Sequence, residues 1–276
     1  MKNMYSSEEA DLLHRLDELF TEWKRVAEAP SGFWFIPDGF YPNYFRQNPR
    51  ILYIGRDAHD LYGEDDENGE TTYIEKFLPQ YLSGKMGDAK RNINGVKFHK
   101  LLIEVAYGII HECNWNQSTD EPSKPHVPYA SEICGHDGKV FDRVSFAFMD
   151  LCKWSHESCE GSGNGTGVAW NAVDTFIEQS AKENRNFILD EISLLSPDIV
   201  ISMNFGRELI SRFSSGKFQL VDDKNENCFV YKMEFDSIQK PVFLFDTWHF
   251  SGSKSEEKCI YNPLVQQIDA YWRKER

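Results

Sequence analysis

The sequence predicts an α/β fold of three layers, in which a short, largely parallel central sheet of about four core strands is flanked by helices. Three observations lead to this prediction. Four short apolar runs are bounded by turn-forming residues, helical patterns alternate with them, and each run ends in polar or glycine residues. Near-continuous apolar runs are typical of strands that are covered on both faces.

The predicted strands are the runs ILYIG (51–55), RVSFAFM (143–149), DIVISM (198–203) and PVFLFD (241–246). Apolar residues at helical spacing predict helices over residues 7–28, 96–110, 169–195, 206–213 and 258–273. The first of these has Ser6 or Ser7 as its cap, and the third is expected to break near Asn184 to Asn186.

The remaining stretches are expected to be irregular. An aromatic, turn-rich arm follows the first helix, and residues 60–95 and 111–142 are long polar loops. Turn residues predict a hairpin within residues 214–240. We expect one domain over residues 1–276. Its core is residues 50–255, which lie between an N-terminal helix and arm (1–49) and a C-terminal helix (256–276).

Composition restricts the partners. The 276 residues include 44 acidic and 30 basic ones, and the formal charge of −14 disfavours non-specific binding to nucleic-acid phosphates. No run is long enough to span a bilayer, so we expect no membrane partner. The polar start MKNMYSSEEADLLHRL predicts no secretory signal, and hence a cytoplasmic protein with six reduced cysteines.

The residues that follow the four predicted strands are all polar or small. Gly55-Arg56-Asp57 follows the first strand, Asp150 the second, Asn204 the third, and His249 and Ser251 follow the fourth. In open α/β sheets, ligands bind outside the carboxyl ends of the strands. We therefore expect Asp57, Asp150 and His249 to meet around one cavity.

These short motifs resemble those of the uracil-DNA glycosylase superfamily. Gly55-Arg56-Asp57 is similar to the family's first motif, and Asp150 with Lys153 is similar to a strand ending in Asn with Lys three residues on. Residues 196–203 resemble a third strand, and His249-Phe250-Ser251 resembles the family's His-Pro-Ser motif. The matches occur in family order over about residues 50–255.

The resemblance implies cleavage of an N-glycosidic bond. Asp57 would stabilise the oxocarbenium character of the sugar and orient a water, and His249 would donate to the departing base. Gly55 would let the backbone approach the ligand and Ser251 would bind a phosphate. Arg56 and Ala58 complete this part of the binding set. In the alternative interpretation these residues are structural. Asp57 caps a turn, His249 is an ordinary loop histidine, Ser251 lies in a flexible turn and Arg56 forms a salt bridge.

Asp150 stands where the family has its base-reading Asn. An ionised carboxylate only accepts hydrogen bonds, so it would face uracil O4 unfavourably, whereas a protonated one could pair with cytosine. Protonation would require a pKa raised by burial. We therefore expect that uracil is not the best base, or that catalysis is weak. Alternatively, Asp150 points elsewhere and bonds backbone.

A flipped base needs an aromatic platform, for which Tyr62, Tyr73 and Phe77 are candidates, and a wedge, for which Phe250 is the candidate. A local basic rim could be formed by Lys85, Lys90, Arg91, Lys97, Lys100, Lys254 and Lys258.

The sequence thus predicts a DNA glycosylase for a damaged or deaminated base, with no metal and no cofactor. Two alternatives remain open. The chain is a hydrolase of free nucleosides or nucleotides, which would suit its acidic character, or a non-catalytic module that binds a small nucleobase ligand or a protein.

Overall fold

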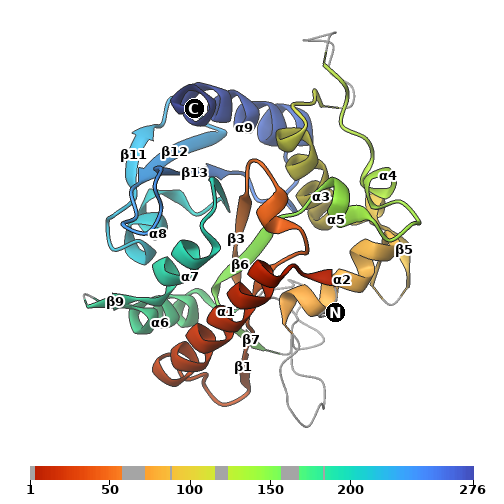
Figure 1. Cartoon of the computed structure of the whole chain (residues 1–276). Helices are drawn as coiled ribbons and strands as arrows, with labels where there is room; N and C mark the ends of the chain where they lie inside the picture. The colour runs from red at the N-terminus through yellow and green to blue at the C-terminus, as the bar shows by residue number, and fades with distance from the viewer. Residues whose placement is uncertain (1–3, 58–71, 88, 116–123, 157–167, 183) are drawn as a thin grey trace.

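The fold is built on a mixed sheet of seven strands whose four central members run parallel (Figure 1). The computed structural model describes residues 4–57, 72–87, 89–115, 124–156, 168–182 and 184–276. In spatial order the strands are β11 (Gln219–Asp222), β12 (Cys228–Met233), β13 (Val242–Thr247), β10 (Ile199–Met203), β3 (Ile51–Asp57), β6 (Ala147–Cys152) and β2 (Gly39–Phe40).

The four parallel strands correspond to the four apolar runs of the sequence, but β6 begins at Ala147 and continues to Cys152, so Asp150 lies within this strand and does not follow it. Their register aligns Ile201 with Tyr53, and Tyr53 with Phe148, so the strands end at one common edge. Counted along the chain, the order across the sheet is second, first, third, fourth. The order therefore reverses between β3 and β10, which is the place where doubly wound sheets bind ligands.

The expectation of about four strands was too small. β2 pairs antiparallel with β6 at one edge, and β12 and β11 extend the sheet beyond β13 at the other. The predicted hairpin within residues 214–240 does form, but it joins the sheet instead of projecting from it. The arm likewise contributes β2 and a second strand, β1 (Phe33–Phe35), which pairs with β7 (Trp154–His156).

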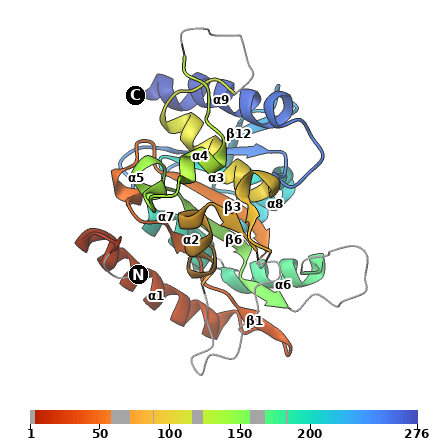
Figure 2. The ribbon, with the colours of Figure 1, turned by 90° about the vertical axis from the view of Figure 1, so that its right-hand side faces the viewer.

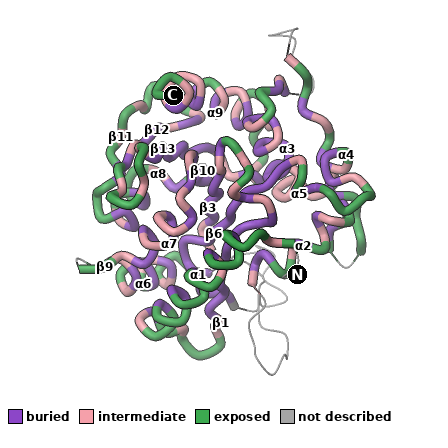
Figure 3. The backbone as a smooth tube through the Cα atoms, in the orientation of Figure 1, coloured by how far each residue is buried: buried purple, intermediate pink, exposed green. Residues whose placement is uncertain are grey.

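Helices cover both faces of the sheet, and Figure 3 shows its parallel strands as the buried centre of the structure. One face carries α2 (Tyr73–Ser83), α3 (Lys97–Ile110), α4 (Ala130–Cys134), α5 (Val140–Arg143) and α9 (Asn262–Gln267). The other carries α1 (Ser7–Val26), α6 (Trp170–Ser180), α7 (Phe187–Leu195) and α8 (Gly206–Phe213) (Figure 2). Alternate residues of β3 supply the two clusters, as expected for a strand covered on both faces.

The local sequence explains where these helices begin and end. Ser6, one of the two predicted caps, caps α1 and also forms a capping box with Glu9. The predicted break between α6 and α7 is a small hairpin of β8 (Ala181–Lys182) and β9 (Arg185–Asn186). Residues 60–95 are not all loop, because α2 and the hairpin of β4 (Lys85–Met86) and β5 (Arg91–Asn92) lie within them.

Two further expectations can be compared with the described part of the chain. No helix within it has the length and apolar content that crossing a bilayer requires. Cys113, Cys134, Cys152, Cys228 and Cys259 are free thiols, and Cys159 lies outside the described residues.

The buried carboxyl group of Glu104 on α3 gives a prediction for stability. Burial raises the pKa of Glu104 to about 7, and its Oε1 accepts from the N–H of Ala130 at 2.9 Å. The unfolded chain ionises this group near pH 4.5, whereas the folded one keeps its proton, so stability falls as pH rises from about 4.5 to 7. We expect Glu104→Gln to unfold with a free energy up to about 3 kcal/mol larger than wild type at pH 8, and little different at pH 4, in urea titrations. An equal difference at both pH values would contradict this.

Candidate active site

A cavity of about 580 Å³ opens at the carboxyl ends of the parallel strands. Its volume is within the range of roughly 300–1,000 Å³ that is usual for small-molecule sites. All four strands contribute to it: Gly55, Arg56 and Asp57 at the end of β3, Asp150 in β6, Met203 and Asn204 at the end of β10, and His249 and Ser251 after β13. The structure therefore brings Asp57, Asp150 and His249 together around one space.

Asp57 is held on both of its carboxylate oxygens. Oδ1 forms an ion pair with the neighbouring Arg56, and Oδ2 accepts from the backbone N–H of Val168 at 2.7 Å. The guanidinium of Arg56 also lies 4.9 Å from the ring of Trp170, which is 54% exposed at the cavity. Arg56 thus makes the predicted salt bridge, and does so as part of the cavity wall.

His249 is fixed in one neutral tautomer. Its Nδ1 accepts from the backbone N–H of Ser251 at 3.2 Å and lies 2.7 Å from Ser251 Oγ, so the ring proton is on Nε2. Burial lowers the pKa of His249, and Arg56 lowers it further while Asp57 opposes this. The ring stacks on Phe98 at 5.8 Å. His249 is therefore a neutral N–H donor, and Ser251 serves first to orient it.

Two lysines of the predicted basic rim instead hold the loop that carries His249. Lys97 Nζ donates to the backbone oxygens of Gly252 and Lys254, the latter at 3.0 Å. Lys100 forms an ion pair with Glu256 at 2.7 Å. These contacts fix residues 248–256 against α3, so Lys97 and Lys100 are engaged within the protein.

Aromatic rings form one wall of the cavity. Tyr73 stacks on Phe148 with 4.1 Å between the ring centroids, and Phe77 lies 4.6 Å from Tyr73. His99 packs on Phe77 at 4.4 Å, and burial lowers its pKa to about 3, so it too is neutral. Flat apolar walls of this kind suit a planar ring.

Asp150 forms part of the floor and is only 2% exposed. Its Oδ1 lies against the backbone of Gly55, since a Cβ built at Gly55 would come within 2.4 Å of it. Oδ2 has no hydrogen-bond partner among the described residues. Burial raises the pKa of Asp150 well above its usual range, and the nearby Asp38 and Asp57 raise it further.

A buried ionic cluster lies next to Asp150. Lys153 Nζ forms ion pairs with Asp38 and, at 2.7 Å, with Glu191, and all three side chains are fully buried. Asp38 also accepts from the backbone N–H of Asp150 at 2.8 Å. Burial raises the pKa of Glu191 to about 7 and also raises that of Asp38. Burial alone would lower the pKa of Lys153, but the two carboxyl groups raise it overall.

The prediction that Phe250 is a wedge is wrong. Its side chain is fully buried and packs edge-to-face on Tyr53 at 5.8 Å, so it belongs to the core. Ala58 and Tyr62 lie outside the described residues. Sequence reasoning missed the cavity residues Phe98, His99, Phe148, Trp170 and Phe205. Phe98 and His99 lie near the start of the predicted helix 96–110, and Trp170 near the start of the predicted helix 169–195, so these helix starts carried the usable signal.

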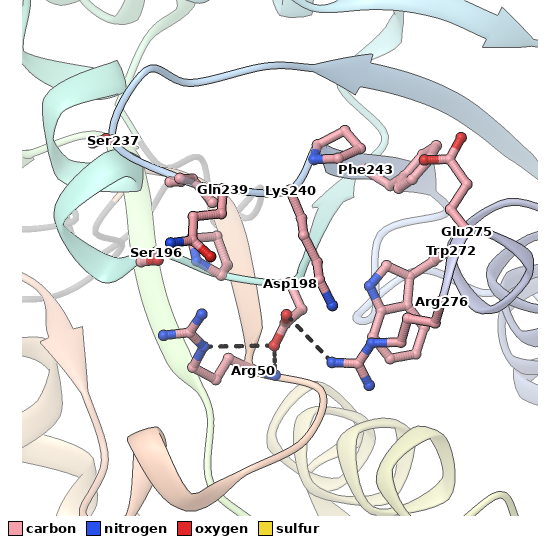
Figure 4. Close-up of a pocket in the computed structure, with 13 residues that line it drawn as sticks. Arg50, Ser196, Asp198, Ser237, Gln239, Lys240, Phe243, Trp272, Glu275 and Arg276 are labelled. Carbon is pink, nitrogen blue, oxygen red and sulfur yellow. Dashed lines mark hydrogen bonds and ion pairs between the residues drawn. The ribbon is translucent and has the colours of Figure 1, made fainter.

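A second cavity, of about 500 Å³, lies at the opposite, amino edge of the sheet (Figure 4). Asp198 accepts there from the backbone N–H of Arg50 at 2.8 Å and faces the guanidinium groups of Arg50 and Arg276 at 3.5 and 3.6 Å. The charges of Asp198, Arg50 and Arg276 pair with one another, so these ion pairs join the C-terminal segment to the starts of β3 and β10.

The described residues contain no group of three or more His, Cys, Asp or Glu side chains arranged to hold a metal ion. Comparisons with protein-family models, with curated proteins and with solved structures found no match.

The contact between Gly55 and Asp150 gives a direct prediction. In Gly55→Ala, the new methyl group would come within 2.4 Å of Asp150 Oδ1 and 3.0 Å of the Phe148 ring. We expect a loss of about 1–3 kcal/mol in the free energy of unfolding, measured in urea, and weaker ligand binding. Gly95→Ala is the matched control, because nothing lies within 4 Å of its new methyl group. Equal stability of the two variants would show that Asp150 does not need this space.

Proposed function

We propose that this protein is a uracil-DNA-glycosylase-like hydrolase that cleaves the N-glycosidic bond of a damaged or deaminated base in DNA. The observation that carries the proposal is the meeting of Asp57, Asp150 and His249 around one cavity with an aromatic wall. The order of the motifs along the chain supports it as well.

The chemistry follows from the environment of each group. The bond to the base breaks as positive charge grows on the sugar and negative charge on the base. The carboxylate of Asp57, oriented by Arg56 and Val168, would stabilise the sugar and accept a proton from the attacking water. The neutral ring of His249 would donate its Nε2 proton in a hydrogen bond to the departing base.

A hydrolase of free nucleosides or nucleotides is the second candidate, and one observation favours it. Of the described residues that line the cavity, Arg56 is the sole lysine or arginine, and its charge is already paired with Asp57. Affinity for DNA depends largely on cations that contact phosphates. A cavity that binds only a base and its sugar does not need them.

Trp170 is our candidate for the contact with the nucleotide beside the extruded base. Its indole is half-exposed at the cavity, and Arg56 stacks on it. An exposed aromatic ring of this kind can stack on a neighbouring base, which is the role that buried Phe250 cannot perform.

The first test measures base release from oligonucleotides that carry uracil, hypoxanthine or 8-oxoguanine, and from the free nucleosides. We expect Asp57→Asn and His249→Ala to lower the rate by about 10²–10⁴-fold, because each removes a group that acts in the transition state.

Asp223→Asn and His14→Ala are the matched controls, since both residues lie on the surface away from the cavity. Full activity of Asp57→Asn and His249→Ala would remove the site assignment. Wild-type protein that releases no base from any substrate would leave the non-catalytic binding module as the better interpretation.

The second test separates DNA from free nucleosides. We expect Trp170→Ala to weaken binding of a single-stranded oligonucleotide by about 5- to 100-fold, the effect of one lost base–aromatic stack. Trp170→Phe should restore most of this, and hydrolysis of the matching nucleoside should be unchanged. Tyr129→Ala, which removes another half-exposed ring, is the control. If nucleoside hydrolysis fell by the same factor, Trp170 would belong to the cavity wall alone.

A further inference from the structure

Asp57 and Asp150 are two carboxyl groups in one cavity with opposite surroundings. They come from neighbouring parallel strands, in which Gly55 aligns with Asp150 and Asp57 with Cys152. Asp57 has a guanidinium and a backbone N–H on its oxygens. Asp150 has no hydrogen-bond partner on Oδ2 and packs on the bare backbone of Gly55. Such a pair commonly divides into one ionised and one protonated carboxyl group.

The charge next to Asp150 supports this division. Lys153 is the nearby cation, and its ion pairs go to Asp38 and Glu191, so Asp150 has no ion pair of its own among the described residues. One buried ammonium group cannot balance three buried carboxylates. The titratable groups that face Asp150 are Asp38, Asp57, Tyr73, Cys152, Lys153 and Glu191. Burial raises the pKa of Asp150 well above its usual range, Asp38, Asp57 and Glu191 raise it further, and Lys153 opposes this.

We propose that Asp150 is the general acid of the reaction, a neutral carboxyl group that protonates the leaving base while Asp57 remains the carboxylate that activates water. This inference rests on the proposed function, and it adds a proton donor to the hydrogen bond from His249.

The step is balanced as follows. Asp150 gives its proton to a ring nitrogen of the base as the C1′–N bond breaks and the bonding electrons move to the base. The water oxygen bonds to C1′, and the water proton passes to Asp57. The base leaves neutral, the sugar gains a hydroxyl group, and solvent returns the proton from Asp57 to Asp150.

A general acid of this kind indicates the class of base. Uracil carries only carbonyl oxygens as acceptors, whereas a purine also carries ring nitrogens with free lone pairs. Protonation of such a nitrogen converts the leaving group into a neutral base. We therefore infer that the substrate is a deaminated purine, hypoxanthine, in preference to uracil. Pairing of a protonated Asp150 with cytosine would use both carboxyl oxygens, and it is disfavoured because Oδ2 is buried.

The test uses single-stranded oligonucleotides that contain hypoxanthine, 7-deazahypoxanthine or 3-deazahypoxanthine, in which one ring nitrogen at a time is replaced by C–H. We expect wild-type protein to release hypoxanthine faster than uracil, and to lose about 10²–10⁴-fold on one of the two deaza bases. Asp150→Asn should lose the same factor on hypoxanthine. Asp150→Asn should release that deaza base no more slowly than wild type does, because the variant and the deaza base each remove the same proton transfer.

A second readout follows the proton itself. The infrared difference between wild type and Asp150→Asn at pH 7 should contain the C=O stretch of a protonated carboxyl group. Asp223→Asn is the control for both readouts. If the rate reductions from Asp150→Asn and from the deaza base multiplied when the two were combined, the proposal would be overturned, although glycosidic hydrolysis would stand. Absence of the infrared band would have the same consequence. Release of uracil alone would overturn the substrate class. Wild-type protein inactive on every base would remove the proposed function and this inference together.

Discussion

The ammonium group of Lys153 links three distant parts of the chain at the base of the site. It forms ion pairs with Asp38 from the N-terminal arm and Glu191 from α7, and it lies over the rings of Phe20 and Trp23 in α1. Asp38 in turn accepts from the backbone of β6 at Asp150. Removal of one partner from a buried ion pair commonly costs about 3–5 kcal/mol, so these segments are constrained to one arrangement.

Asp57 and His249, which share the cavity with Asp150, are held by backbone donors. Val168 N–H fixes Asp57, and Ser251 N–H fixes the tautomer of His249. The loop that carries His249 is in turn bound to α3 by Lys97 and Lys100. Groups oriented in this way need little reorganisation when a ligand enters, which is the condition for electrostatic stabilisation of a transition state.

The sequence predicted the parallel core because continuous apolar runs are a strong signal, and the polar residues after each run marked the cavity edge. Short or half-exposed elements gave no such signal. β2 has two residues, and α2 has Pro79 within a mainly polar segment, although Thr72 and Glu75 form a capping box that could have been recognised. The partners of Lys153 could not be predicted, since Asp38 and Glu191 are 115 and 38 residues away and only the packing brings them together. The prediction for Phe250 was wrong because its position in a motif does not tell whether the side chain points into the cavity or into the core.

Asp150 shows why a residue's chemistry depends on its surroundings. From the sequence alone, Asp150 is expected to be ionised and to accept hydrogen bonds only. Uracil would then be a poor ligand, because the asparagine amide of the motif that this segment resembles can also donate. In the folded chain the same group is buried and has no hydrogen-bond partner on Oδ2 among the described residues. The neighbouring cation, Lys153, forms its ion pairs with Asp38 and Glu191. Burial favours the protonated form of Asp150, which donates as an amide does but can also release the proton. The difference from the glycosylase motif is thus what would let Asp150 act as the proposed general acid, a role that an asparagine at this position could not have.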